Sequence, residues 1–153
     1  MRPLAEAAGG RVEPLPTLGC ACANLRRAAR AVTQLYEESL RATGLRTTQF
    51  TLLQVLARRG AMTQGALGDL LAIDSTTLTR SLRPLAKEGW IIARPGEDRR
   101  EVHWSLTAAG ERVVTRARPA WERAQERLKS RLTATQWSRL FDDLAAVAAA
   151  ARS

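Results

Sequence analysis

The sequence predicts a mainly α-helical fold that contains one small β-hairpin. Apolar residues recur at steps of three and four over most of the chain, which is the period of an amphipathic helix. Only the stretch from Trp90 to Leu106 instead contains two short strand-like segments around a turn. With 153 residues, the chain suits one domain with a substantial core.

The first half of the chain is expected to form four helices after a flexible leader at residues 1–16, which is rich in proline and glycine. The helices are predicted at about Leu18–Leu40, Thr48–Arg59, Thr63–Ala72 and Ser75–Glu88. Gly44, Gly60 and Gly89 close the first, second and fourth of them. Asp74 or Ser75 caps the fourth, in which Pro84 is expected to bend or loosen one turn.

The second half is expected to hold the hairpin and two further helices. Residues 90–93 and 102–106 have strand patterns, and residues 94–98 favour a turn. Thr107 caps a helix from about Ala108 to Arg131, and Pro119 is expected to interrupt it. Thr133 and Gln136 form a capping box that opens the last helix.

The charge balance favours an anionic partner. Lys and Arg number 24 against 15 Asp and Glu, a formal net charge of +9, which favours nucleic acid through counterion release, with a membrane surface as the competing partner. The start of the chain lacks a signal-peptide pattern, and no apolar run approaches the length of a membrane span. We therefore expect a cytoplasmic protein without a membrane partner.

Residues 63–88 have the layout of a helix-turn-helix, two short helices joined by a tight segment. The second helix of this motif enters the major groove by its N-terminal end. Hydroxyls adapt to several base edges or to phosphates, and arginine pairs with guanine, so this end is the predicted DNA-reading site. Its candidate residues are Ser75, Thr76, Thr77, Thr79 and Arg80. The alternative is that these hydroxyls only cap the helix.

The hairpin is predicted to supply a second DNA contact. Arg94, Arg99 and Arg100 lie on or beside its tip, where arginine can enter a minor groove. Asp98 is expected to pair internally with an arginine and to stiffen the tip. The alternative is a solvated charged turn.

Together these segments resemble the MarR (multiple antibiotic resistance regulator) family of winged helix-turn-helix transcriptional regulators. The resemblance rests on the run Asp74 to Leu82, on Leu85, on Gly89-Trp90-Ile91, on Asp98-Arg99-Arg100 and on Leu106 to Gly110, and it covers about residues 18–150. The spacing from Asp98 to Leu106 also matches.

The resemblance implies a homodimer in which the first and the last two helices intertwine. It implies that the two recognition helices of the dimer, the fourth predicted helix of each chain, read successive major grooves of a pseudo-palindromic double-stranded DNA operator. It also implies that the hairpin acts as the wing, with Arg99 in the minor groove and with Asp98 and Arg100 bracing the hairpin. The expected division is a single domain at residues 17–153. About 46–107 form its DNA-binding lobe, and about 17–44 and 108–152 its dimerisation helices.

Dimerisation is also expected from the residues themselves. Residues 18–40 and 134–151 carry apolar stripes at opposite ends of the chain. Their apolar surface is larger than a small DNA-binding lobe can cover. Burying them against a second copy stabilises the assembly by about 25 cal/mol per Å². The alternative is that the same helices pack within one chain.

Cys20 and Cys22 are the only reactive-looking groups in the sequence. On a helix, residues two apart differ by about 200°, so we expect these thiols to point apart and not to bridge without unwinding of the helix. The spacing after Cys22 is similar to the organic-hydroperoxide-sensing branch of the family, but Leu25, Thr47 and Phe50 stand where that branch places tyrosines. Packing residues, a redox sensor and a soft-metal or metalloid site remain open.

Regulation by a small ligand is the other possibility, with Tyr36, Phe50 and Trp104 as candidates to line a cleft. No cofactor or bound metal is predicted, because two cysteines and the lone His103 are too few ligands for zinc. Enzyme motifs are absent from the sequence, so the prediction is a DNA-binding regulator, most simply a repressor. The alternatives are a winged-helix protein-interaction or architectural DNA-binding module and, more remotely, a thiol peroxidase.

Overall fold

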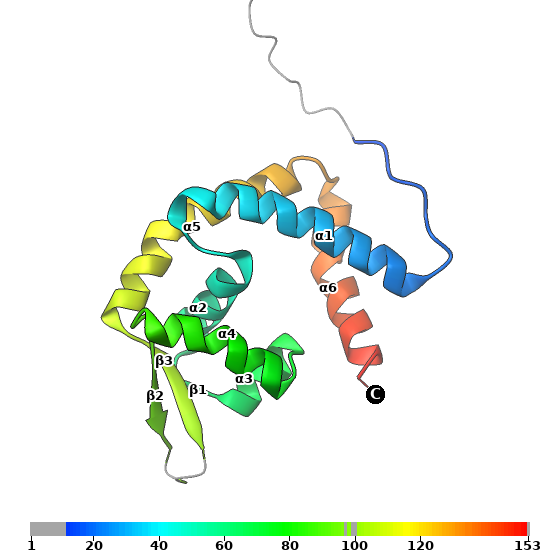
Figure 1. Ribbon diagram of the computed structural model, residues 1–153. Helices are drawn as coiled ribbons and strands as arrows, with labels where there is room; N and C mark the ends of the chain where they lie inside the picture. Colours follow the sequence, from blue (N-terminus) through cyan, green and yellow to red (C-terminus); the bar gives the residue numbers. More distant parts are fainter. Residues whose placement is uncertain (1–11, 97, 99–100, 153) are drawn as a thin grey trace, which may run out of the picture.

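The computed structural model describes residues 12–96, 98 and 101–152. Its elements are α1 (Ala21–Leu40), a 3₁₀ turn (Arg41–Thr43), α2 (Thr47–Arg59), β1 (Met62–Thr63), α3 (Gln64–Leu71), α4 (Ser75–Lys87), β2 (Ile91–Pro95), β3 (Val102–Leu106), α5 (Ala108–Lys129) and α6 (Ala134–Ala150). The predicted fold class, helices with a small antiparallel hairpin, is confirmed (Figure 1). Most of the expected leader, residues 1–11, lies outside the described residues.

Local capping chemistry sets most helix ends where the sequence predicted them. The hydroxyls of Thr107 and Thr133 accept hydrogen bonds from the amides of Gly110 and Gln136, at 3.1 and 3.2 Å. Gly44 and Gly89 follow helices with φ values of 75° and 70°, in the left-handed region that glycine adopts without strain. Each cap satisfies backbone groups that the helix itself leaves unpaired.

Two predictions about the helices are corrected. The first helix begins at Ala21 and not at Leu18, so Cys20 is its N-cap residue, with extended backbone angles of −132° and 123°. Pro119 does not interrupt α5, which continues to Lys129, although the helix changes direction between its two halves in Figure 1. Burial of Ala117 and Ala120 against the core holds the chain helical on both sides of the proline.

Pro84 likewise lies within α4, which runs unbroken from Ser75 to Lys87. Its ring nitrogen leaves the carbonyl of Arg80 without the usual amide donor four residues on. Leu78, Leu82 and Leu85 are fully buried, as predicted, and this packing keeps the helix in one piece around Pro84.

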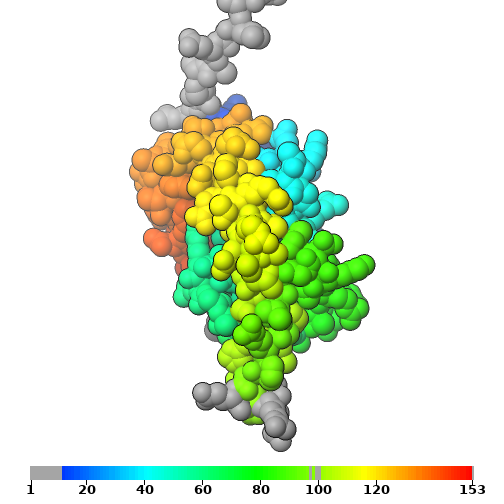
Figure 2. Space-filling model, turned by 90° about the vertical axis from the view of Figure 1, so that its left-hand side faces the viewer, coloured from blue at the N-terminus to red at the C-terminus, as the bar shows by residue number. Residues whose placement is uncertain are grey.

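The sheet has three strands in the order β1-β3-β2, all antiparallel. Ile91 pairs with Leu106 at the base of the hairpin, and Pro95 pairs with Val102 near its tip. The two-residue strand β1 was not predicted; Met62 pairs there with Trp104. Figure 2 shows the hairpin as the lower end of the molecule, below the body formed by the helices.

The core lies where α2, α4 and α5 meet the base of the sheet. Leu53, Leu67 and Leu78 are completely buried, and the ring of Phe50 packs at 6.1 Å from that of Trp121. This core joins the helix-turn-helix and the hairpin to the first half of α5, and it thereby sets the direction in which α4 and the hairpin face the solvent.

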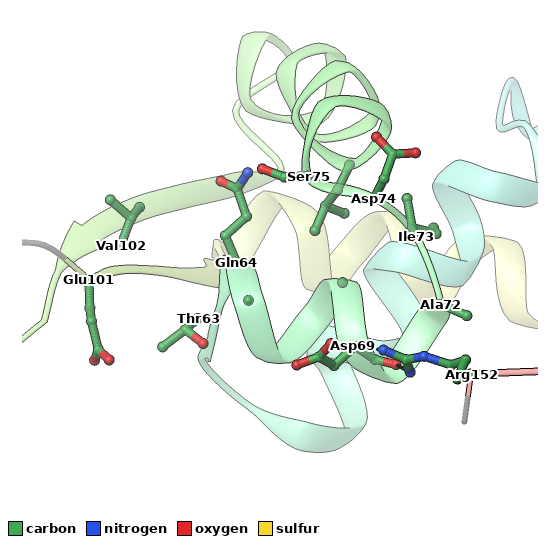
Figure 3. Close-up of a pocket in the computed structure, with 13 residues that line it drawn as sticks. Thr63, Gln64, Asp69, Ala72, Ile73, Asp74, Ser75, Glu101, Val102 and Arg152 are labelled. Carbon is green, nitrogen blue, oxygen red and sulfur yellow. Dashed lines mark hydrogen bonds and ion pairs between the residues drawn. The ribbon is translucent and has the colours of Figure 1, made fainter. Parts of the chain in front are cut away.

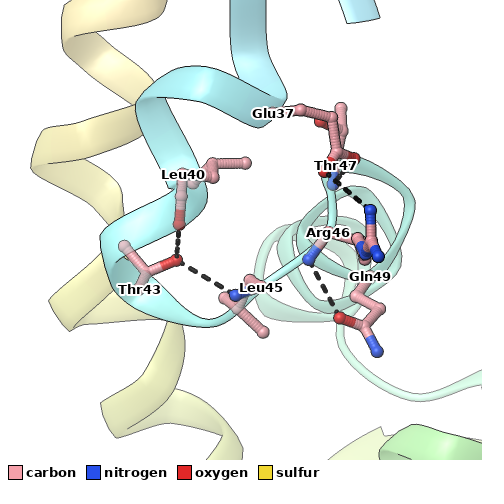
Figure 4. Close-up of polar contacts among 7 residues, drawn as sticks. All are labelled: Glu37, Leu40, Thr43, Leu45, Arg46, Thr47 and Gln49. Atoms are coloured by element: carbon pink, nitrogen blue, oxygen red, sulfur yellow. Dashed lines mark hydrogen bonds and ion pairs between the residues drawn. The ribbon is translucent and has the colours of Figure 1, made fainter. Parts of the chain in front are cut away.

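The joint between α1 and α2 is held by polar contacts (Figure 4). The Glu37 carboxylate accepts from the amide of Thr47 at 2.8 Å and lies 3.7 Å from the guanidinium of Arg46. The Thr43 hydroxyl donates to the carbonyl of Leu40 at 2.7 Å and accepts from the amide of Leu45 at 3.3 Å. These contacts set the direction in which α2 leaves α1.

The two terminal helices contribute only Leu40 of α1 to this core. No residue of α6 is buried, and in α1 only Leu40 is buried. The α1 and α5 helices lie side by side, joined by the hydrogen bond from the Tyr36 hydroxyl to Gln125 at 2.6 Å and by the Glu38–Arg127 ion pair at 2.9 Å. In the described part of the chain, no helix combines the length and hydropathy needed to cross a bilayer.

Candidate nucleic-acid interface

The α3 and α4 helices form the helix-turn-helix that the sequence predicted. Thr63 caps α3 by accepting from the amide of Ala66 at 3.1 Å, and Ala72 ends it with a left-handed φ of 52°. The turn is tight because the amide of Ile73 donates to the carbonyl of Gly68 at 2.9 Å. A Cβ on Gly68 would lie 3.0 Å from the Ile73 carbonyl oxygen, so the close approach favours glycine there.

The start of α4 is capped by Asp74, whose carboxylate accepts from both the amide and the hydroxyl of Thr77, at 2.9 and 2.6 Å. These two hydrogen bonds lower the pKa of the Asp74 carboxyl from its ordinary value. The Thr77 hydroxyl is thereby engaged in the cap. For Thr77, the geometry therefore agrees with the alternative that the hydroxyl caps the helix and does not read DNA.

The lowered pKa of Asp74 predicts a pH dependence of stability. The ionised carboxylate stabilises the folded chain above the ordinary carboxyl pKa of about 4, and this contribution is lost as the pH falls through the lowered folded pKa. We expect the urea midpoint of the wild-type protein, relative to that of Asp74→Asn, to be higher at pH 6 than at pH 2.5. Equal differences at the two pH values would contradict the assignment.

The outward face of α4 carries the other predicted reading residues. Ser75, Thr76, Thr79 and Arg80 are all exposed. Within the described part of the chain, the hydroxyls of Ser75 and Thr76 have no hydrogen-bond partner. The hydroxyl of Thr79, in contrast, is hydrogen-bonded to the Gln64 side chain and to the Ser75 carbonyl. The side chains that remain free to meet a ligand therefore gather at the first turn and at Arg80.

Arg83 is a candidate that the sequence analysis missed. It is exposed and lies three residues after Arg80, so the two guanidinium groups share one face of α4. The step of three from Arg80 was visible in the sequence, and the buried positions 78, 82 and 85 already excluded Arg83 from the inner face. Its position extends the positive surface along the helix.

The hairpin tip is closed by backbone hydrogen bonds. The amide of Gly96 donates to the carbonyl of Glu101 at 2.9 Å, and the amide of Glu101 donates to the carbonyl of Asp98 at 2.9 Å. A Cβ on Gly96 would lie 2.9 Å from the His103 ring, so that ring packs directly on the glycine backbone. Arg94 is exposed on β2, opposite His103. Arg99 and Arg100 lie outside the described residues, so the expected brace and minor-groove contact stay predictions.

A depression of about 820 Å³ opens between α3, the start of α4 and the beginning of β3 (Figure 3). Gln64, Ser75 and Val102 line it, and Asp69 and Arg152 close one end. The Arg152 guanidinium donates to the Asp69 carbonyl at 2.7 Å and to its carboxylate at 3.0 Å. The chain end after α6 is thereby joined to the C-terminal end of α3.

Cys20 and Cys22 are both exposed at the start of α1. Because Cys20 precedes the helix, the 200° rotation expected between two helical residues does not apply to this pair. Packing within one chain does not account for either thiol.

The three candidate cleft residues have separate surroundings. Phe50 is buried in the core against Trp121, with 2% of its surface exposed. Tyr36 bonds Gln125 across α1 and α5, and burial raises the pKa of its hydroxyl. Trp104 is half-buried in β3, with an indole nitrogen that has no partner among the described residues. A ligand cleft formed by them stays a prediction.

A short helix-turn-helix followed by an antiparallel hairpin defines a winged helix-turn-helix protein. The MarR family model matches residues 45–102. The chain is 34% identical to the M. tuberculosis transcriptional regulator MosR, in a crystal structure in complex with DNA. The superposition has a TM-score of 0.79 and covers 87% of this chain and 96% of that one.

Two further relatives are described as HTH-type transcriptional regulators. YwoH of Bacillus subtilis (strain 168), itself uncharacterized, is 33% identical over 88 residues, which are 58% of this chain and 64% of that protein. PecS of Dickeya dadantii (strain 3937) is 30% identical over 109 residues, which are 69% and 63%. The chain thus spans slightly less than two thirds of the length of these two proteins. It belongs to the MarR family, as the sequence motifs indicated.

Proposed function

We propose that this protein is a sequence-specific double-stranded DNA-binding transcriptional regulator, most simply a repressor. The observation that carries the proposal is the outer face of α4, where Ser75, Thr76, Arg80 and Arg83 are exposed beside the hairpin. Hydroxyls and arginines at the start of such a helix suit base edges and phosphates. The net charge of +9 and the likeness to MosR, solved with DNA, support the same partner.

The proposed working unit is a homodimer on a pseudo-palindromic operator in the cytoplasm. Apolar side chains on the terminal helices support it, because an exposed apolar stripe of this kind is stabilised by burial. They are Leu18 just before α1, Leu25 and Val32 on α1, and Phe141, Leu144 and Val147 on α6, each at least 36% exposed in the single chain. In the dimer, residues 46–107 would form each DNA-binding lobe, and residues 17–44 and 108–152 the shared dimerisation helices.

The hairpin is proposed to hold the flanking minor groove. Arg94 is exposed on β2 in support of this role. Arg99 is the proposed minor-groove residue, and Asp98 and Arg100 are the proposed brace, on the strength of their matching positions in the family motif.

Arg80→Ala tests the function. We expect it to lower affinity for an operator selected from random duplexes by about 10- to 100-fold, because a bidentate arginine–guanine contact contributes roughly 1–3 kcal/mol of discrimination. We also expect it to relax selection at one base pair in each half-site. Fluorescence anisotropy on the selected duplex and its single-base variants measures both effects.

Arg131→Ala is the matched control for loss of one charge. Arg131 is exposed in the segment between α5 and α6, which lies far from α4 and the hairpin in Figure 1, and its removal should change operator affinity by less than about twofold. If the wild-type protein selects no sequence, or if Arg80→Ala binds the operator as well as wild type does, the recognition-helix assignment fails. A winged-helix module for protein contacts or for architectural DNA binding would then be favoured.

Thiol oxidation is the proposed release signal that the structure favours over a cleft ligand, because both cysteines are exposed. A thiolate of Cys20 or Cys22 attacks a hydroperoxide, so that a sulfenic acid and an alcohol form and the O–O bond breaks. Metalloid binding to the same two thiols is the alternative signal.

We expect a stoichiometric amount of organic hydroperoxide to reduce operator affinity of the wild-type protein at least tenfold, and reductant to restore it. The Cys20→Ser and Cys22→Ser variants identify the responding thiol, and arsenite in place of peroxide tests the metalloid alternative. Unchanged affinity in both treatments contradicts a thiol signal. Continuous peroxide consumption with added reductant would instead support the thiol peroxidase alternative.

A further inference from the structure

The hydroxyl group of Thr79 makes two hydrogen bonds within the helix-turn-helix. It donates to the carbonyl oxygen of Ser75 at 2.8 Å, one turn earlier in α4. It also accepts from the side-chain nitrogen Nε2 of Gln64, the first residue of α3, at 2.8 Å. The contact therefore joins the side chains of the two helices of the motif.

The directions of these two hydrogen bonds follow from the chemistry of the groups. A backbone carbonyl oxygen can only accept, so the single hydroxyl proton of Thr79 points to Ser75. The Gln64 amide must then present its NH₂ group and not its oxygen to Thr79. The two contacts fix the hydroxyl from two sides.

This arrangement limits how Thr79 can read DNA. Phosphate oxygens, guanine N7 and O6, adenine N7 and thymine O4 are all acceptors, and Thr79 has no proton left to donate to them. Its hydroxyl oxygen keeps one lone pair, which can only accept from an adenine or cytosine amino group, and its other recognition group is the methyl carbon Cγ2. Apolar contact with the 5-methyl group of thymine is an established use of a threonine methyl in the major groove.

We propose that Gln64 is a positioning residue that holds Thr79 so that its methyl group reads a thymine in each half-site. The proposal rests on the proposed DNA-binding function and specifies how one position of the operator is chosen. It separates Thr79 from Ser75 and Thr76, whose exposed hydroxyls have no partner among the described residues and can donate to acceptors.

The test uses the full-length protein and its selected operator, with deoxyuridine replacing each thymidine in turn. This replacement removes only the 5-methyl group. We expect wild-type affinity to fall about fourfold at one thymine of each half-site, the effect of losing roughly one methyl contact. Thr79→Val keeps a methyl and lacks the hydroxyl that Gln64 holds, so it should still bind the operator and should show a deoxyuridine response reduced as in Gln64→Ala.

Thr79→Ser should bind the thymidine and deoxyuridine operators equally at that position, and Gln64→Ala should reduce the difference between them. Thr76 provides the matched pair, for which the order should reverse: Thr76→Ser keeps affinity and Thr76→Val loses it. Circular dichroism melts confirm that the variants are folded.

If wild type selects an operator but shows no deoxyuridine effect, the methyl contact is overturned and the proposed function stands. If Thr79→Val loses affinity while Thr79→Ser keeps it, the hydroxyl is the reading group and the proposal is also overturned. Failure of the wild-type protein to select any sequence contradicts the proposed function as well.

Discussion

Leu144→Glu is expected to convert the protein from dimer to monomer and to lower its operator affinity by at least about a hundredfold. Leu144 is 46% exposed in the single chain and lies on the apolar face of α6 with Phe141 and Val147. A glutamate buried there in the proposed interface, without a partner, costs several kcal/mol. A monomer also binds one half-site at a time, so it loses the gain from joining two contacts.

Sedimentation velocity and operator anisotropy at the same protein concentrations measure the two effects together. Ala146→Glu is the matched control, because two residues on a helix turn the new carboxylate by about 200° to the opposite face of α6. That variant should remain dimeric and bind DNA as wild type does. A dimeric Leu144→Glu protein would remove α6 from the proposed interface.

Gly110→Ala is expected to give the largest loss of stability, about 3 kcal/mol in the free energy of unfolding. A Cβ at this position would overlap the carbonyl oxygen of Trp90 and come within 3.0 Å of the Leu106 side chain. The overlapped atom is backbone and cannot rotate away. It also accepts from the amide of Thr107 at 3.0 Å, so moving it breaks the joint between the sheet and α5.

Urea unfolding followed by circular dichroism measures this loss. Gly65→Ala is the control for the substitution itself, since the atom nearest to its new Cβ is 4.0 Å away and alanine favours the helix. It should leave stability unchanged or raise it by about 0.5–1 kcal/mol. Equal stability of the two variants would contradict the tight packing at Gly110.

Short-range chemistry made much of the fold predictable. Thr107, Thr133 and Asp74 each cap a helix by contacts within three residues, and these ends were predicted from residue type alone. The alternation around residues 102–106 likewise predicted β3. All of these signals lie within one turn or one strand, so no knowledge of distant partners was needed.

The sequence predictions were wrong where a distant partner or a local backbone conformation decides whether an element forms or where it begins. The strand β1 exists because Met62 meets Trp104, 42 positions further along the chain, and two residues carry no periodic signal of their own. At the start of α1, Leu18 continues the helical period, yet Asn24 accepts from the Leu18 amide and donates to its carbonyl, at 3.1 and 2.7 Å. That local ring competes with the helix and moves its start to Ala21.

The sequence alone determined the helical class, the helix-turn-helix with its hairpin, the family and the exposed start of α4. These features were predictable because periodicity, caps and motif spacing are local properties of the chain. Only the tertiary structure decided which hydroxyls of that helix are free, since Thr79 is held by Gln64 from another helix. It also decided that Arg152 reaches Asp69. Such contacts join residues far apart in sequence, and they depend on how the core orients the helices that carry them.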